Sequence, residues 1–216
     1  MEVLITGTSK GIGKATALKF LNEGHNVWGL DVEQSSIEHE HYQHFLCNVT
    51  NPESFPGLYF MEVVINNAGV QNSGCDIEVN LMGTINITER YAMQPYIKAV
   101  VNVASTSAHN GAEFPEYAAS KGGMLAYTKN VALRIAQYGA TCNSISPGGV
   151  LTSMNNHIIR NRALWKEVMQ ESLIKKWATP EEIAEWIYFV AVVNKSMTAQ
   201  DIIIDNGELA NANFVW

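Results

Sequence analysis

Residues 3–31, VLITGTSKGIGKATALKFLNEGHNVWGLD, carry the pattern from which the fold can be predicted. The apolar run 3–5 predicts a buried strand that leads directly into the glycine-rich segment 6–13. Apolar residues then recur at helical spacing between 15 and 21, and Gly24 closes that helix. Residues 26–31 predict a second buried strand that ends in Asp31. Strand, helix and strand together indicate a βαβ unit of a parallel sheet.

The same alternation of strands and helices continues along the chain. Further strands are expected at 45–49, 62–66, 99–103, 142–146 and 201–205, with helices at 76–90, 115–138 and 180–193, the last with Thr179 as its N-cap. Residues 50–61 are barely long enough for a parallel crossover, so a full helix is doubtful there. Because most of these strands are apolar throughout, we expect an α/β fold with a doubly wound parallel sheet of about seven strands, covered on both faces.

Size and composition fit one soluble domain over residues 1–216. Of the 216 residues, 47% are hydrophobic and 16% are charged, and the formal net charge of −7 disfavours nucleic acid or an anionic membrane as a partner. The longest apolar run, 186–193, is far shorter than the roughly 20 residues of a spanning helix. No basic and apolar leader precedes the first strand, so a cytoplasmic location is expected.

The cysteine positions predict no disulfide bond, and the metal-binding residue types predict no metal site. Cys47, Cys75 and Cys142 form no CxxC pair and are expected to be reduced, buried thiols. No cluster of His, Cys, Asp and Glu has metal-ligand spacing. We therefore expect no metal site.

The glycine-rich segment has the setting of a phosphate-binding loop. Gly7, Gly11 and Gly13 would let backbone N–H groups approach a pyrophosphate at the start of a helix, where the helix dipole favours negative charge. Their spacing differs from the common GxGxxG, and a plain tight turn is the alternative.

Asp31 at the end of the second strand indicates which dinucleotide would bind. Its carboxylate could accept hydrogen bonds from the adenosine ribose hydroxyls and would repel a 2′-phosphate. Glu33 follows and no Arg or Lys does, so NAD is favoured over NADP, while Lys10 is the one opposing hint. A turn-forming aspartate is the alternative.

Tyr117 and Lys121 could form a base. They lie four residues apart in the helix predicted over 115–138 and would share one face. A nearby ammonium stabilises a phenolate and lowers a tyrosine pKa from about 10. An exposed Tyr/Lys pair is the alternative.

The segment 66–69 and Ser105 follow two predicted strands, at the edge where a doubly wound sheet binds its ligand. A turn for the segment and a cap for the serine are the alternatives.

With these residues in order, the chain resembles the short-chain dehydrogenase/reductase family, in particular its 3-oxoacyl reductases, from Met1 to about Gly207. The matching elements are TGTSKGIG (6–13), Asp31, Asn48-Val49, NNAG (66–69), VNL (79–81), Ser105, YAASK (117–121), SPGGVLT (146–152) and ATPEEIAEWIYFVA (178–191). The resemblance implies a Rossmann fold and an NAD(P)-dependent oxidoreductase that interconverts a secondary alcohol and a ketone, with a 3-oxoacyl or a sugar- or polyol-like substrate.

The resemblance also implies a role for each matching residue. Tyr117 would be the acid/base, Lys121 would lower its pKa and hold the nicotinamide ribose, and Ser105 would bind the substrate oxygen. Asn80 would hold a water that relays protons to Lys121. The residues expected around the dinucleotide are Gly7, Lys10, Gly11, Ile12, Gly13, Asp31, Asn48, Val49, Asn67, Ala68, Gly69, Tyr117, Lys121, Pro147, Gly148, Val150 and Thr152.

Several departures from the family pattern keep a second function open. Asn48 stands where the family usually has an Asp that accepts the adenine amino group, although an amide oxygen can still accept. Ser105 precedes Tyr117 by 12 positions, one fewer than the usual interval. The crossovers after the third and fourth strands are short, which should expose part of the adenine end. A dinucleotide-binding sensor or scaffold with vestigial turnover is the alternative function.

Further expectations concern the lid, the assembly, the C-terminal tail and one histidine. Residues 153–178 would form a substrate lid, whose cations (Arg160, Arg162, Lys166, Lys175 and Lys176) belong either to an ordinary solvated helix or to a basic rim that attracts anionic substrates. The apolar helix 115–138 suggests a homo-oligomer, a dimer or tetramer. The apolar tail 210–216 is expected to pack on a neighbouring subunit or beside a substrate pocket. His109, beside the active-site loop, either touches substrate or is incidental, as a loop histidine more often is.

Overall fold

The computed structural model describes residues 1–112 and 114–211. Its centre is one sheet of seven parallel strands in the order β3-β2-β1-β4-β5-β6-β7. The strands are β1 (Glu2–Thr6), β2 (Asn26–Asp31), β3 (Tyr42–Leu46), β4 (Val63–Asn66), β5 (Ala99–Val103), β6 (Thr141–Pro147) and β7 (Asp201–Ile204). The strand order reverses between β1 and β4, which creates a topological switch point where a doubly wound sheet binds its ligand.

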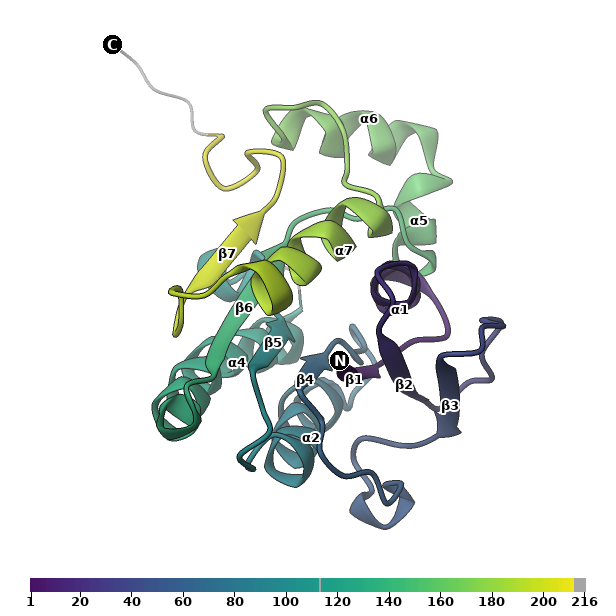
Figure 1. Cartoon of the computed structure of the whole chain (residues 1–216). Helices are drawn as coiled ribbons and strands as arrows, with labels where there is room; N and C mark the ends of the chain where they lie inside the picture. Colours follow the sequence, from purple (N-terminus) through teal and green to yellow (C-terminus); the bar gives the residue numbers. More distant parts are fainter. Residues whose placement is uncertain (113, 212–216) are drawn as a thin grey trace.

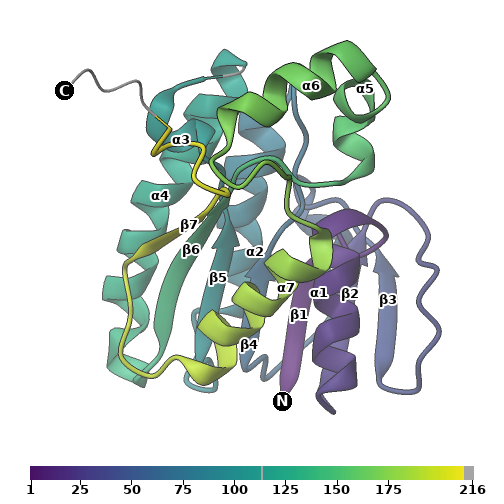
Figure 2. The same cartoon turned by 90° about the horizontal axis from the view of Figure 1, so that it is seen from above.

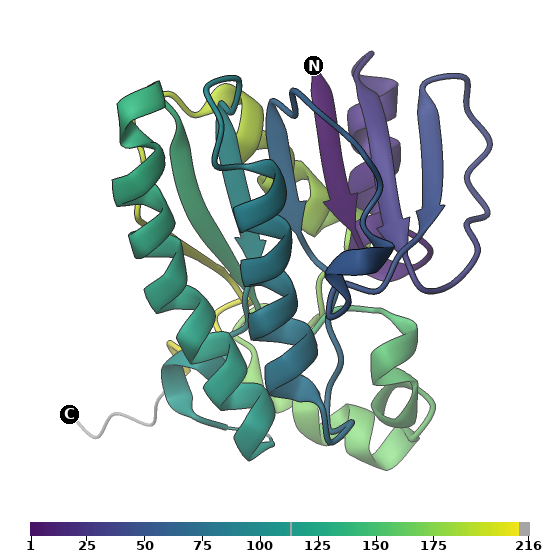
Figure 3. The ribbon, with the colours of Figure 1, turned by 90° about the horizontal axis from the view of Figure 1, so that it is seen from below.

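Helices cover both faces of this sheet. On one face α1 (Gly11–Asn22) packs beside α7 (Pro180–Tyr188), and on the other lie α2 (Gly83–Tyr91) and α4 (Pro115–Ile135), as Figure 1, Figure 2 and Figure 3 show. The shorter helices are η1 (Pro52–Ser54), η2 (Ile77–Met82), α3 (Ser107–Asn110), η3 (Ala136–Tyr138), η4 (Ser153–Asn155), α5 (Asn156–Ile159), α6 (Arg162–Glu171) and η5 (Phe189–Val193). Among the described residues, no helix combines the length and apolarity needed to span a bilayer.

Alternating residues of the strands supply two separate cores. In β1, Val3 and Ile5 belong to the core beneath α1 and α7, whereas Leu4 belongs to the core beneath α2 and α4. Each fully buried side chain of this size stabilises the fold by about 1.5–3 kcal/mol. The two cores confirm the predicted sheet that is covered on both faces.

Most predicted elements are present, and the differences have local causes. The strands at 26–31 and 99–103 begin and end as predicted, whereas the third strand lies at 42–46 rather than 45–49. It ends early because the Asn48 side chain accepts the Thr50 amide and starts a turn. As expected, 50–61 contains only the short η1.

Three predicted helices change type near an end. The helix predicted over 76–90 starts as the π-helical η2 before α2. The one predicted over 115–138 becomes α4 followed by the 3₁₀ turn η3, and the one predicted over 180–193 becomes α7 followed by the π-helical η5. Thr179 caps α7 as predicted, in a capping box with Glu182.

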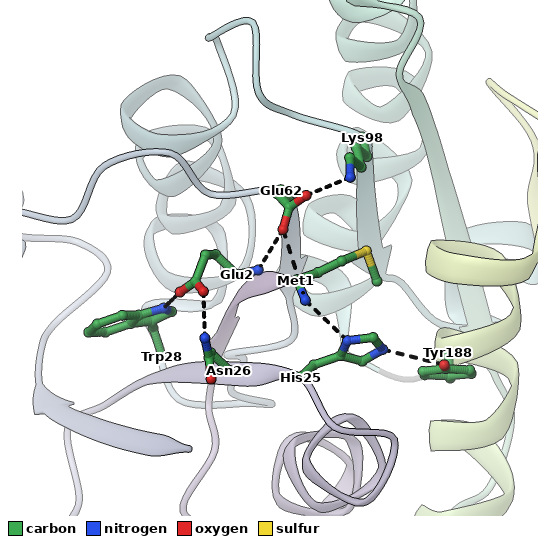
Figure 4. Close-up of polar contacts among 8 residues, drawn as sticks. All are labelled: Met1, Glu2, His25, Asn26, Trp28, Glu62, Lys98 and Tyr188. Carbon is green, nitrogen blue, oxygen red and sulfur yellow. Dashed lines mark hydrogen bonds and ion pairs between the residues drawn. The ribbon is translucent and has the colours of Figure 1, made fainter. Parts of the chain in front are cut away.

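The edge where the strands begin is held by the carboxylate of Glu62, which precedes β4 (Figure 4). Glu62 Oε2 accepts the Glu2 amide at 2.9 Å, and Oε1 pairs with Lys98 Nζ at 2.5 Å. Burial alone would raise the pKa of Glu62, but the Lys98 ammonium and the Glu2 amide outweigh it and leave that pKa below its usual value. Figure 4 also shows Glu2 binding Asn26 and Trp28 of β2, so two glutamates connect β1, β2 and the starts of β4 and β5 at this edge.

The three cysteines are free thiols, but only two are buried. Burial raises the pKa of Cys47 and of Cys142. Cys75 is half-buried, because it follows Gly74 in the exposed loop that leads into η2. The prediction of three buried thiols is therefore wrong for Cys75.

Candidate active site

A cavity of about 690 Å³ opens at the carboxyl ends of the central strands. Its walls include residues that follow each of the seven strands, and α5 and α6 lie across that edge of the sheet (Figure 2). All the predicted site residues line this cavity except Gly13 and Asn80. The sequence motifs, which are scattered over the chain, are therefore brought to one place.

The glycine loop after β1 interlocks with the segment 66–69 after β4. Gly7 and Gly11 have φ of 75° and 56°, values that a residue with a side chain rarely adopts. A Cβ on Gly13 would lie 2.0 Å from the Gly7 carbonyl oxygen, so Gly13 lets α1 close onto β1 without reaching the cavity. Asn67 Nδ2 donates to the Thr6 carbonyl at 3.0 Å and fixes the second loop against the first. Neither loop is a free turn.

Asp31 and its neighbours form the far end of the cavity. Asp31 Oδ2 accepts the Ser9 amide and Oδ1 accepts the Glu33 amide, both at 2.9 Å, so the carboxylate is fixed in the cavity wall. Lys10, the one cation suggestive of a 2′-phosphate, forms an ion pair with Glu33. Its charge is thereby partly neutralised.

Asn48 also lines this end, but its amide oxygen is already used. Asn48 Oδ1 accepts both the Thr50 amide at 3.0 Å and the Thr50 hydroxyl at 2.9 Å. These two bonds use both lone pairs of the oxygen. The arrangement disfavours the expected role of this oxygen as the acceptor for an adenine amino group.

Tyr117, Lys121 and Ser105 lie together at the other end. Lys121 is almost wholly buried, its Nζ donates to the Val103 carbonyl at 2.8 Å, and it lies 5.6 Å from the centre of the Tyr117 ring. The helical spacing in α4 therefore places the ammonium beside the phenol, as predicted. Ser105 is buried just after β5, and its Oγ accepts the Ser107 amide at 3.2 Å. This acceptance leaves the Ser105 hydroxyl proton available to a substrate oxygen.

Asn80 sits behind the cavity wall, on the π-helical η2. Its Oδ1 accepts the Val70 amide at 2.8 Å, and its Nδ2 donates to the Val70 carbonyl at 2.9 Å and to Ser120 Oγ at 3.0 Å. A Cβ on Gly69 would lie 3.1 Å from Asn80 Oδ1 and 3.6 Å from Lys121 Nζ. The Asn80 side chain thus holds the segment 69–70 in place close to Lys121.

The loop after β6 fits closely against two side chains that sequence reasoning missed. A Cβ on Gly149 would lie 2.1 Å from Trp177 Nε1, and one on Gly148 would lie 2.7 Å from Glu208 Oε2. Both side chains line the cavity. The paired glycines of SPGG were the available signal, because adjacent glycines at a ligand edge indicate close approach by another group.

The structure does not favour a basic rim on the lid or a role for His109 in the cavity. None of the lid cations named above lines the cavity, which favours a solvated lid helix over a basic rim. Lys176 forms an ion pair with Glu182 instead. His109 Nε2 lies 2.8 Å from Asp201 Oδ2, an intramolecular contact outside the cavity lining. Within residues 1–112 and 114–211, no group of three His, Cys, Asp or Glu side chains gathers for a metal.

The backbone at the start of α1 suits the phosphates of a dinucleotide. The N-cap of α1, Lys10, makes no side-chain cap, and the first two helical residues, Gly11 and Ile12, line the cavity, so an anion bound there would lie at the N-terminus of the helix. Glycines that a Cβ would disrupt surround this point. A doubly wound sheet with such a site at its switch point defines a dinucleotide-binding fold of the Rossmann type.

Comparison with known proteins gives the family. Residues 7–208 match the family described as enoyl-(acyl carrier protein) reductase. The short chain dehydrogenase AdrF of Penicillium roqueforti is 34% identical over 180 residues, which are 70% of each chain. The 3-oxoacyl-[acyl-carrier-protein] reductase FabG of Thermotoga maritima is 27% identical and covers 94% of this chain and 96% of its own. A 4-hydroxyisoleucine dehydrogenase mutant complexed with NADH and succinate shares the fold, with a TM-score of 0.89 at 24% identity over 99% of this chain and all of its own.

The chain belongs to the short-chain dehydrogenase/reductase family and is similar to its 3-oxoacyl reductases. The family and the fold class predicted from sequence are confirmed.

Proposed function

We propose that this protein is an NAD(H)-dependent oxidoreductase that interconverts a secondary alcohol and a ketone, with Tyr117 as the acid/base. The observation that carries the proposal is the position of Lys121, whose ammonium is held by the Val103 carbonyl at 2.8 Å and lies 5.6 Å from the Tyr117 ring centre. Ser105 lines the same cavity. The three groups together can bind and protonate one oxygen atom.

Each side chain has one task in the proposed reaction. Ser105 donates a hydrogen bond to the substrate oxygen and steadies the charge that develops there. In the reductive direction Tyr117 gives its proton to that oxygen, and the Lys121 ammonium stabilises the phenolate that remains. In the oxidative direction Tyr117 takes the proton back. A nicotinamide bound near Pro147, Gly148, Val150 and Thr152 would supply or accept the hydride.

The expected cofactor is NAD. Asp31 at the far end would accept the ribose hydroxyls and repel a 2′-phosphate. The Lys10–Glu33 ion pair supports this choice, because it partly neutralises the cation that could bind that phosphate. NAD should therefore raise the melting temperature more than NADP at equal concentration, and Glu33→Gln, which releases Lys10, should narrow the difference. An unchanged difference would count against the role of the ion pair.

The test of the reaction is NADH oxidation with a panel of ketones. Tyr117→Phe should lower kcat/KM by roughly 10²–10⁴-fold while leaving NADH binding intact. Tyr127→Phe is the matched control, because Tyr127 lies on the same helix with its hydroxyl on Glu89 at 3.0 Å and does not line the cavity. NADH binding without turnover of any ketone would instead favour the sensor or scaffold function.

We further propose that the protein is cytoplasmic, as the sequence led us to expect, and that it assembles as a dimer or tetramer, for which the structure offers an argument. Support comes from Leu133 on α4, which is 80% exposed, and from Trp186 and Phe189 of the α7–η5 segment, which are 44% and 45% exposed. A monomer by light scattering would contradict the assembly. The expected packing of the tail 210–216 falls mainly on residues 212–216, which lie outside the described residues.

A further inference from the structure

Acidic side chains line the cavity on the side of the lid, for which the sequence left open an ordinary solvated helix or a basic rim. Glu171 of α6 and Glu208 after β7 both line the cavity that holds Ser105 and Tyr117. Among the described residues, those that line the cavity include four carboxylates (Asp31, Glu33, Glu171 and Glu208) and two lysines (Lys10 and Lys121). Lys10 pairs with Glu33 at the far end, and Lys121 lies under Tyr117.

Glu208 is held at the nicotinamide-binding loop by the backbone around it. A Cβ on Gly148 would lie 2.7 Å from Glu208 Oε2, so the carboxylate rests directly on that glycine. Asp205 shapes the turn that delivers it, because Oδ1 accepts the Gly207 amide at 2.9 Å and Oδ2 accepts the Leu209 amide at 2.8 Å. The position of Glu208 is therefore built into the fold.

The same turn is tied to the end of α6 that carries Glu171. Asn211 Nδ2 donates to the carbonyls of Gln170 and Glu171, both at 2.8 Å. The lid and the segment after β7 thus reach the cavity as one connected wall. Both wall segments contribute a carboxylate to the lining.

The cations of the lid segment 153–178 do not face the cavity. Lys176 pairs with Glu182, and Lys175 Nζ donates to the Gln170 carbonyl at 3.1 Å. Arg160, Arg162 and Lys166 are exposed and do not line the cavity. Of the lid residues 153–178 that line the cavity, His157 is the only one with a basic side chain.

We propose that Glu208, assisted by Glu171, selects uncharged, hydroxyl-bearing ketones and alcohols and rejects substrates with a phosphate or carboxylate near the reacting carbon. Ionised carboxylates accept hydrogen bonds and donate none, so they bind hydroxyl or ammonium groups and repel anions. This proposal rests on the proposed function. It directs that function towards polyol-like substrates and away from short anionic oxo-acids.

The test compares three small ketones with NADH as reductant: dihydroxyacetone, dihydroxyacetone phosphate and aminoacetone. For the wild type, kcat/KM should be at least about tenfold higher for dihydroxyacetone than for its phosphate. Glu208→Gln should reduce that ratio by about tenfold, and Glu171→Gln should reduce it less, because Glu171 is exposed and more strongly screened. In both variants, the kcat/KM for aminoacetone should fall relative to that for dihydroxyacetone, because its ammonium group loses an attractive carboxylate.

Glu167→Gln is the matched control. Glu167 is exposed on the same helix as Glu171 and does not line the cavity, so the ratio should stay at the wild-type value. Equal use of the neutral and phosphorylated ketones by the wild type would overturn the proposal. So would a Glu208→Gln variant that changes only the KM for NADH, because Glu208 would then act on the cofactor.

Failure of the proposed function gives a different result. If no ketone is reduced, binding of the three probes to the NADH-saturated protein is followed by tryptophan fluorescence, since Trp177 lines the cavity. If dihydroxyacetone phosphate binds more weakly than dihydroxyacetone to the wild type, and the difference shrinks in Glu208→Gln, the selection against anions holds even though the proposed reaction fails. Equal binding of all three probes would overturn it.

Discussion

Trp177 lies so close to Gly149 that a methyl group on this glycine would come within 2.1 Å of the indole Nε1. Gly149→Ala should therefore push Trp177 out of the cavity wall. Overpacking of this kind costs about 1–3 kcal/mol. We expect a lower melting temperature, altered tryptophan fluorescence and a reduced kcat/KM for ketones.

Gly57→Ala is the control for this substitution. A Cβ on Gly57 meets no atom within 4 Å, and its φ is not positive. It should leave the melting temperature unchanged or raise it slightly. Equal behaviour of the two variants would contradict the close fit.

Asn48→Asp should tighten NADH binding. The single amide oxygen of Asn48 is occupied by the Thr50 amide and hydroxyl, whereas an aspartate could keep those bonds with one oxygen and offer the second to an adenine amino group. One added hydrogen bond of this kind would lower Kd by about 2–10-fold. NADH fluorescence titration measures the effect.

Asn51→Asp adds the same charge three residues away and does not line the cavity, so it should leave the Kd unchanged. A Kd for Asn48→Asp equal to that of the wild type would remove residue 48 from adenine recognition.

The sheet and the positions of most site residues follow from local sequence patterns. Each strand is short and apolar, and each motif follows the end of a strand, so parallel topology alone brings Gly7, Asn67, Ser105 and Pro147 to one edge. The contact of Lys121 with Tyr117 follows from helical spacing in the same way.

The lid side of the cavity could not be predicted because it depends on contacts between distant segments. Trp177 and Glu208 reach the loop after β6 from 28 and 60 residues away, respectively, and no period or spacing relates them to Gly149 and Gly148. The Asn48 turn was missed for a different reason. An asparagine side chain can bind its own backbone or a ligand, and sequence does not show which bond it makes.

Adjacent glycines on α4 should respond differently to alanine. A Cβ on Gly122 meets no atom within 4 Å, so Gly122→Ala should stabilise the protein by about 0.5–1 kcal/mol through the lower backbone entropy of the unfolded chain. A Cβ on Gly123 would lie 2.8 Å from Leu81 Cδ2, and Gly123→Ala should lose that gain or destabilise. Chemical denaturation measures both, and equal free energies of unfolding would contradict the prediction.

Cys75 should be the first cysteine to react with a thiol reagent. It is half-buried in the loop before η2, whereas Cys47 and Cys142 are buried and have raised pKa values that disfavour the reactive thiolate. Brief treatment with iodoacetamide followed by peptide mass spectrometry should show alkylation at Cys75 alone. Cys75→Ser should then resist modification under the same conditions, and early labelling of Cys142 would contradict the predicted order.

The stability of the protein should depend on pH through Glu62. Its carboxylate faces Lys98, the Glu2 amide and the Met1 ammonium, and its pKa is lowered in the folded protein. A lowered folded pKa gives stability that is present above the unfolded value, about 4.3, and is lost as pH falls through the folded pKa. Glu62→Gln should therefore melt below the wild type at neutral pH, and the gap should shrink below about pH 4.

The exposed Glu38 provides the comparison for Glu62, since Glu38→Gln removes one carboxylate from the surface without touching Lys98. Its melting temperature should track that of the wild type across the acid range. High salt should narrow the Glu62→Gln gap at neutral pH as well, because the Lys98 side chain is 60% exposed and its ion pair is screened. A gap that stays constant from neutral to acid pH would mean that Glu62 acts through its shape and hydrogen bonds, and that its charge does not stabilise this edge of the sheet.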